Sequence, residues 1–99
     1  MTINVERDME LVTLEITGRL DTTTASNLES VVNDLSENTK ELVFDISGVE
    51  YISSAGIRVL IGAYKKINLQ KGTMRIVKAN EQVYEVFEMT GLSDMLDKE

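Results

Sequence analysis

The sequence contains no cysteine, no histidine and no proline among its 99 residues. The first two absences exclude thiolate nucleophiles, imidazole bases, disulfide frameworks and typical structural zinc sites. Any chemistry would fall to carboxylates, hydroxyls or lysines. We expect no catalytic residue, no metal and no cofactor. Without proline, repeats or low-complexity segments the chain shows no linker, and its length predicts a single domain over residues 1–99.

Long apolar runs are missing as well. The longest, residues 59–64, is far too short to span a bilayer. The first ten residues carry Glu6, Asp8 and Glu10, and no apolar run follows that could serve as the core of a signal peptide. The absence of cysteine also fits a reducing compartment. These features predict a cytoplasmic protein with no membrane insertion.

Positive charge is scarce, because ten Lys and Arg residues face seventeen Asp and Glu residues and give a formal net charge of -7 at pH 7. Phosphate backbones and anionic lipids attract clustered basic residues. The charge therefore argues against nucleic acid as a partner. Lys65, Lys66 and Lys71 do cluster, and we interpret them as a solvated face late in a helix, where cations favour the dipole.

Apolar periodicity predicts the order of strands and helices. Alternation over residues 12–17 indicates a half-buried strand, with a shorter partner strand at residues 3–5 and a hairpin turn at 7–10. The later pattern predicts a helix over 24–36, a buried strand over 42–46, a loop over 47–53, a helix from Ser54 that Gly72 ends, a strand over 74–79, a helix capped by Asn80, and a last turn near 92–96. This alternation predicts an α/β fold with a largely parallel sheet.

Residues 45–56 join the buried strand to the second helix, which is the place where open α/β sheets usually bind ligands and partners. Two hydroxyl groups, those of Ser53 and Ser54, lie here beside free backbone N–H groups and the positive end of a helix dipole. The next two residues, Ala55 and Gly56, are small. A phosphate on Ser54 would be tolerated there. On the pattern alone, the simplest interpretation is a serine N-cap followed by a packing glycine.

Other functional interpretations find less support. Asp21 and Asp45 could form the magnesium site of a receiver-like domain, but ordinary turn-forming aspartates explain them better. The glycines do not have P-loop or dinucleotide-binding spacing, so nucleotide binding has no support. We interpret the later methionines, Met74, Met89 and Met95, as core residues.

Motifs along the whole chain resemble those of STAS domains of the bacterial anti-sigma factor antagonist type. They are Gly18-Arg-Leu-Asp21 with Thr24-Ala25, then residues 45–60, then Gly72-x-Met74 and residues 87–92. The resemblance implies the STAS fold, a mixed sheet of four to five strands flanked by about four helices.

The resemblance also implies a partner switch. The unphosphorylated antagonist would bind an anti-sigma factor that is also a serine kinase, and would release its client. Phosphorylation would end this binding, and a serine phosphatase would restore it. Ser54 matches the phosphoacceptor of the family, and Asp21 matches the acidic residue that lies near it.

Two departures from the family pattern concern the residues beside Ser54. Ser53 stands where many members have aspartate, and Ala55 stands where many have serine or threonine. Ser53 is therefore a rival phosphoacceptor. The predicted partner interface of this monomer comprises Asp21, Ser53, Ser54, Ala55, Gly56 and Arg58. The alternative role is that of a STAS accessory subunit of a lipid or anion transporter, in which Ser54 would be only structural.

Overall fold

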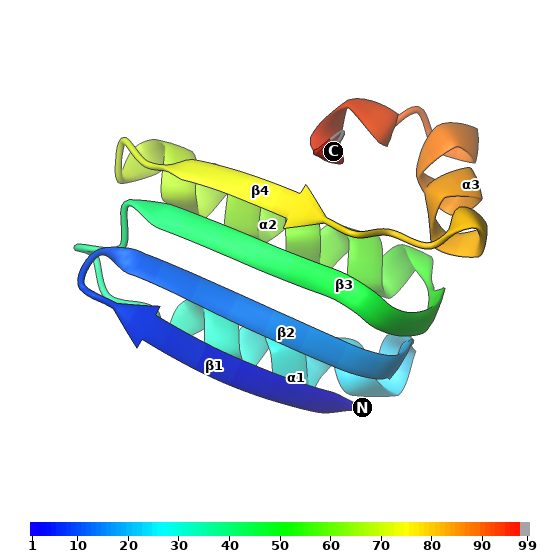
Figure 1. The fold of residues 1–99 in the computed structure, drawn as a ribbon, viewed down its shortest axis with the longest axis horizontal. Coiled ribbons are helices and arrows are strands. Elements are labelled where there is room, and N and C mark those ends of the chain that lie inside the picture. Colours follow the sequence, from blue (N-terminus) through cyan, green and yellow to red (C-terminus); the bar gives the residue numbers. More distant parts are fainter. Residues whose placement is uncertain (98–99) are drawn as a thin grey trace.

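Four strands form one mixed sheet in the order β1-β2-β3-β4 in the computed structural model, which describes residues 1–97 (Figure 1). β1 pairs antiparallel with β2, whereas β2, β3 and β4 are parallel to one another. The elements in chain order are β1 (Thr2–Asp8), β2 (Leu11–Leu20), α1 (Thr22–Asn33), β3 (Glu41–Ile52), α2 (Ser54–Leu69), β4 (Thr73–Val77), α3 (Glu81–Met89) and a 3₁₀ helix, η1 (Ser93–Met95). The largely parallel α/β sheet predicted from the sequence is confirmed.

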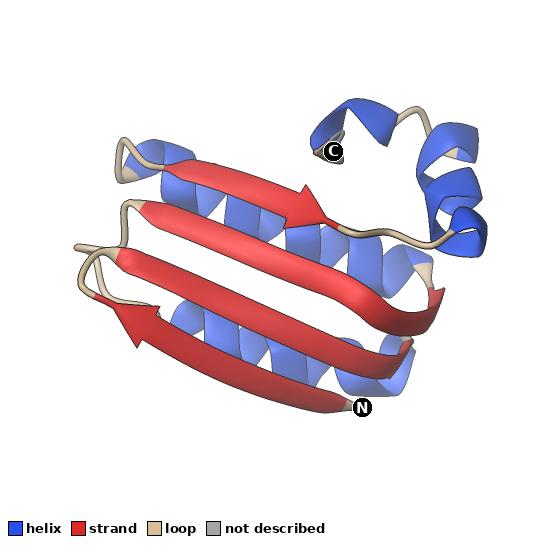
Figure 2. Ribbon diagram, viewed as in Figure 1, coloured by secondary structure: helices blue, strands red, loops and turns tan. Residues whose placement is uncertain are grey.

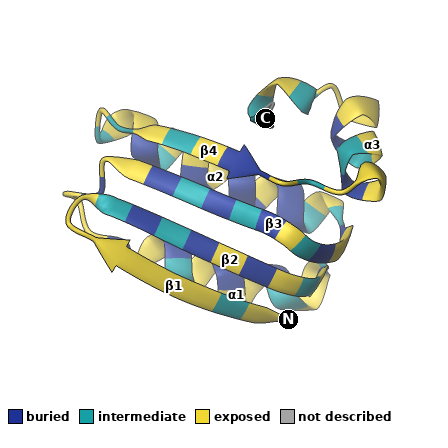
Figure 3. Cartoon of the chain, in the orientation of Figure 1, coloured by how far each residue is buried: buried dark blue, intermediate teal, exposed yellow. Residues whose placement is uncertain are grey.

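The helices α1 and α2 cover the same face of the sheet, and α3 lies beside its end (Figure 2). The buried residues gather in β2, in β3 and on the inner sides of these helices, whereas β1 is largely exposed (Figure 3). The alternation of apolar and polar residues in β2 explains this layering, because every second side chain points to the helices. The largest fully buried side chains include Leu14, Phe44, Leu60 and Phe87.

β3 runs on to Ile52 and replaces the loop that the sequence predicted over residues 47–53. The register between β2 and β3 shifts between Glu15 and Thr17, so the extra residues are accommodated in a bulge. Gly48 makes the close pairing possible, since a Cβ there would lie 2.6 Å from Thr17 Cγ2. Ser-Gly within a strand resembles a turn in sequence, and pairing with β2 overrides that local preference.

The described residues contain three α-helices rather than about four. The last turn predicted near residues 92–96 is the 3₁₀ helix η1, after which the buried Leu96 forms a bridge with Ile76 of β4. The N–H of Asp97 donates to the carbonyl of Ile76 at 2.8 Å. The end of the described chain therefore covers the outer edge of β4.

Lys65 and Lys71 are exposed, as the predicted solvated face requires, and two of the three clustered lysines also have structural roles. Lys66 Nζ donates to the carbonyls that end α1, those of Val32, Asn33 and Leu35. Lys71 takes the left-handed conformation that ends α2, with a φ of 61°, in place of the predicted Gly72. Gly72 is still required, because a Cβ there would lie 2.5 Å from the carbonyl oxygen of Lys40.

The three methionines divide between core and surface. Met74 and Met95 are partly buried against the core, as predicted, whereas Met89 is 86% exposed, so its assignment to the core was wrong. Met89 is the last residue of α3, where the side chain is directed away from the sheet by the helical period. Within the described range, no helix has both the length and the apolar character needed to cross a membrane.

Candidate functional site

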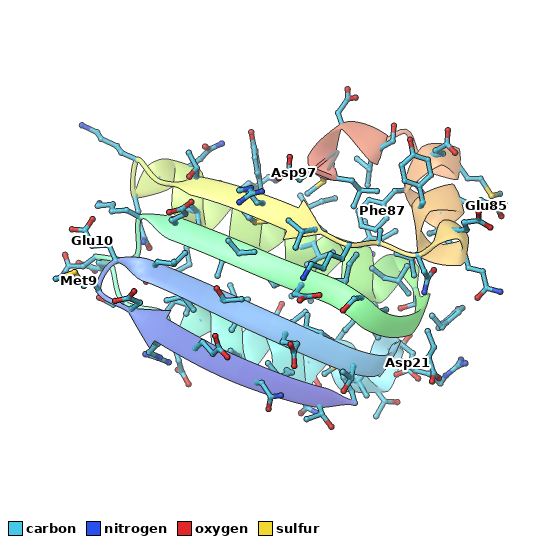
Figure 4. The ribbon with its side chains drawn as sticks, in the orientation of Figure 1. Met9, Glu10, Asp21, Glu85, Phe87 and Asp97 are labelled. Atoms are coloured by element: carbon cyan, nitrogen blue, oxygen red, sulfur yellow. The ribbon has the colours of Figure 1, made fainter. Side chains whose placement is uncertain are left out.

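The N-termini of α1 and α2 lie side by side at the carboxyl ends of two paired strands. Leu20 at the end of β2 pairs with Ile52 at the end of β3, and the N–H of Ser53 donates to the carbonyl of Leu20 at 2.9 Å. Asp21 and Ser53, which follow these residues, each cap a helix. Figure 4 shows Asp21 at the end of the sheet opposite the hairpin turn at Met9 and Glu10.

The two adjacent serines differ in structure. Ser53 is half-buried, and its Oγ accepts from the N–H of Gly56 at 3.3 Å, so it is the N-cap of α2. Ser54 is the first residue of the helix and is exposed. Its hydroxyl makes no hydrogen bond within residues 1–97. The capping role that the simplest sequence interpretation assigned to one serine therefore belongs to Ser53, and the hydroxyl of Ser54 is available for chemistry.

Gly56 lets α2 approach the sheet closely. This residue is buried, and a Cβ would lie 2.7 Å from Leu20 Cγ and 3.1 Å from Ile52 Cγ1. Ala55 is partly buried against the same core. Both residues shape the position of the helix, while Arg58 is exposed on the next turn. Ser54 and Arg58 are thus the exposed residues of this stretch.

Asp21 holds the start of α1 through a reciprocal capping box. Its Oδ1 accepts from the N–H groups of Thr23 and Thr24 at 3.1 Å each, and Thr24 Oγ1 accepts from the N–H of Asp21 at 2.9 Å. The hydrogen bond from the N–H of Thr24 is the main cause that lowers the pKa of Asp21 below its usual value, and it outweighs the opposing effect of desolvation. The carboxylate is therefore anionic at neutral pH beside the N-terminus of α2.

An arginine and a tyrosine that the sequence reasoning missed adjoin this carboxylate. Arg19 Nε lies 3.8 Å from Asp21 Oδ2, and the guanidinium carbon lies 4.4 Å from the centre of the Tyr51 ring. Tyr51 is 43% exposed. The available signal was its position, since a large aromatic residue lies two places before Ser53 where a loop was predicted. Arg19 is thus held by an ion pair and a cation–π contact.

α3 forms the far side of this region. A groove of about 100 Å³ lies between the end of β3 and α3, and its lining residues are Glu50, Tyr51, Ile52, Gln82, Val83 and Val86. Asn80 fixes the two walls, because its Oδ1 accepts from the N–H of Val83 and its Nδ2 donates to the carbonyl of Val49 at 2.8 Å. The predicted cap at Asn80 is confirmed, and it also ties α3 to β3.

Asp45 is engaged in local contacts on β3. Its Oδ1 accepts from the N–H of Ser47, and its Oδ2 lies 3.7 Å from Lys78 Nζ. Partial burial raises the pKa of Asp45, but the hydrogen bonds from Ser47 and the ammonium of Lys78 outweigh it, so that the pKa lies below its usual value. In the part of the chain that the structure describes, no three Asp or Glu side chains cluster as metal ligands would.

Comparisons with known proteins agree with the motifs noted in the sequence. The family model described as STAS domain matches residues 2–98. The anti-sigma-B factor antagonist of Bacillus subtilis (strain 168) is 26% identical over 95 residues, which cover 96% of this chain and 87% of that protein.

Two solved structures show the same fold in different settings. An anti-sigma factor antagonist from Mycobacterium paratuberculosis is 28% identical, with a TM-score of 0.76 over 96% of this chain and 81% of its own. A sulfate transporter family protein from Wolinella succinogenes is 17% identical, with a TM-score of 0.77 over 91% of this chain and 74% of its own. The resemblance drawn from the motifs is confirmed.

Proposed function

Since this chain belongs to the STAS domain family, we propose that it acts as an anti-sigma factor antagonist that is controlled by phosphorylation of Ser54. The names of its relatives from Bacillus subtilis and Mycobacterium paratuberculosis support the antagonist role. In this proposal the unphosphorylated chain binds an anti-sigma factor that is also a serine kinase and releases its client. Phosphorylation ends the binding, and a serine phosphatase restores it.

The observation that carries the proposal is the free, exposed hydroxyl of Ser54 at the first position of α2. A kinase can reach this hydroxyl without breaking any hydrogen bond of the described chain. The rival Ser53 is half-buried and caps the helix through its Oγ. Phosphate on Ser53 would remove that cap, so the geometry favours Ser54.

The energetics of the switch require no change of fold. A 100-fold loss of affinity corresponds to about 2.7 kcal/mol, and opposing one close charge contact at an interface costs roughly 2 to 5 kcal/mol. The positive end of the α2 dipole stabilises a phosphate within the free domain. The unfavourable energy therefore arises where the phosphate meets a desolvated partner surface.

The proposed interface centres on the edge formed by the starts of α1 and α2. Asp21, Ser54 and Arg58 would offer side chains to the partner, while Ser53, Ala55 and Gly56 would hold the helix in place. The role is regulatory and asks for no catalysis by this chain. We propose that it acts as a monomer in the cytoplasm, where it meets the kinase and the phosphatase in turn.

Mass spectrometry after incubation with the anti-sigma kinase from the same genome and Mg-ATP tests the proposal. We expect one phosphate, located on Ser54, in the wild type and in Ser53→Ala, and none in Ser54→Ala. Phosphate on Ser53 in Ser54→Ala at the wild-type rate would transfer the assignment to Ser53. Absence of phosphate from the wild type and both variants would contradict the proposed phosphorylation switch.

The alternative role as an accessory domain of a lipid or anion transporter has weaker support. The likeness to the Wolinella succinogenes protein, at 17% identity, shows the fold alone. Gene neighbours distinguish the two roles, because a kinase or phosphatase gene beside this one favours the partner switch and a permease gene favours the transporter.

A further inference from the structure

Arg58 lies four residues after Ser54 on α2. We propose that its guanidinium pairs, within the same chain, with the phosphate carried by Ser54. The inference rests on the proposed function, because it concerns the phosphorylated form. It assigns to Arg58 a role in regulation.

The spacing of the two residues allows the contact. Residues four apart on a helix have Cβ atoms about 5 to 6 Å from each other, and an acidic group that precedes a basic one by four residues has the favourable orientation. Both positions are exposed, so neither side chain has to displace packed atoms. The planar guanidinium can donate two parallel hydrogen bonds to phosphate oxygens.

Arg58 is also the cation that is free to make this contact. Within residues 1–97 it has no hydrogen bond and no ion pair. By contrast, Arg19 is held by Asp21 and Tyr51. The first turn of α2 has no acidic side chain.

The neighbouring elements contribute charges of both signs. Asp21 caps α1 beside Ser53, Arg19 partly neutralises it, and Glu50 is exposed on β3. Asp21 and Glu50 oppose a second negative charge on the phosphate. Arg58 favours that charge from within the same helix, and its contribution can be isolated by replacing it.

Pairing would change the partner surface in two ways at once. Phosphorylation adds a dianion at Ser54 and withdraws the guanidinium of Arg58 from the surface. A partner that meets Arg58 with a carboxylate loses that contact and faces the phosphate instead.

The experiment installs phosphoserine at position 54 during translation with an expanded genetic code and titrates the phosphate by ³¹P NMR. We expect the second acid dissociation constant of the phosphate to be about 1.4-fold to 2.3-fold larger in the wild type than in Arg58→Gln. The Nε–H signal of Arg58 should also shift on phosphorylation.

Lys65→Gln is the matched control, because it removes the same charge from the same helix. Lys65 lies eleven residues from Ser54, about 16 Å along the axis, which exceeds the Debye length of about 8 Å at physiological salt. Its titration should match that of the wild type. Equal constants for the wild type and Arg58→Gln, or equal effects of both substitutions, would overturn the inference.

Failure of this inference can be told apart from failure of the proposed function. The phosphate is installed without a kinase, so the titration reports on Arg58 even if no kinase modifies the chain. Conversely, a kinase that modifies Ser54 would support the switch even if Arg58 had no effect on the phosphate.

Discussion

The two adjacent serines at the start of α2 have different structural roles. The difference can be measured as a change in the free energy of unfolding. Ser53 holds a helix N–H through its Oγ, whereas the hydroxyl of Ser54 is unbonded within the described chain. The same contrast separates Asp21, whose Oδ1 caps α1 and whose Oδ2 lies beside Arg19, from Arg58, whose guanidinium is unpaired within the described chain.

Replacing each serine by alanine should separate the two roles by their effects on stability. Ser53→Ala removes the N-cap of α2 and should lower the free energy of unfolding by about 1 kcal/mol. Ser54→Ala should leave it almost unchanged, because no hydrogen bond is lost. Urea denaturation measures both values. A larger loss in Ser54→Ala than in Ser53→Ala would show that the cap has been assigned to the wrong serine.

The lowered pKa of Asp21 should make part of the stability depend on pH. A carboxyl group with a lower pKa in the folded state contributes stability above its unfolded pKa, near 4, and that contribution is lost as pH falls through the folded pKa. Asp21→Asn keeps a capping oxygen but does not titrate. Wild type should therefore lose more stability than Asp21→Asn between pH 5 and pH 2 in urea titrations. A difference between the two that stays constant with pH would contradict this.

At the scale of elements, the site depends on how closely α2 approaches β2 and β3. Gly56 permits the approach, and the hydrogen bond from the N–H of Ser53 to the carbonyl of Leu20 fixes the start of α2 at the end of β2. At its other end α2 supports α1, since Lys66 Nζ donates to three carbonyls at the end of α1. The two helices that frame the site are thus held as a pair.

Two glycines of α2 provide a matched test of this packing. Gly56→Ala places a Cβ against Leu20 and Ile52 and should destabilise the fold by about 1 to 3 kcal/mol. Gly62→Ala meets nothing within 4 Å on an exposed helical surface and should stabilise it by about 0.5 to 1 kcal/mol. Thermal and urea denaturation of both variants measure the difference. Equal effects would contradict the close approach of α2.

At the scale of the whole molecule, much of the fold could be predicted from the sequence. The spacing of apolar residues in each element matches the side of that element that is buried between the sheet and the helices. The alternation in β2 and the apolar stripe of α2 identified the sheet and the helix start near Ser54 correctly. The extension of β3 was missed because Ser47 and Gly48 have local turn preferences, and only pairing with β2 places them in a strand. Long-range pairing leaves no mark in a local pattern.

The location of the candidate site could be predicted from the sequence, but the separate roles of its residues could not. The sequence pattern located the start of α2 but could not decide which serine caps it, because both neighbours are good caps. The contact of Arg19 with Tyr51 joins residues 32 positions apart and arises from the β2–β3 register. The exposure of Met89 depends on where α3 ends, which a short apolar segment leaves open.

Binding by the whole molecule should follow the charge at the start of α2. Affinity for the anti-sigma kinase should be highest for the wild type and Ser54→Ala, lower for Ser54→Asp with its single charge, and lowest for the chain with phosphoserine at 54. Isothermal titration calorimetry gives the four dissociation constants. Equal constants would rule out an electrostatic switch at Ser54, even with every variant folded.

The backbone around Ser54 is fixed on both sides. The N–H of Ser53 is bonded to β2, and its carbonyl accepts from Ile57 within α2 at 3.0 Å. A protein kinase that binds its substrates as extended peptides could not engage this segment without unwinding the helix. Under the proposed switch, an enzyme that modified Ser54 would have to recognise a folded surface, and an unfolded copy of the chain would escape phosphorylation. Modification of this serine would then report on the integrity of the molecule as well as on the signal.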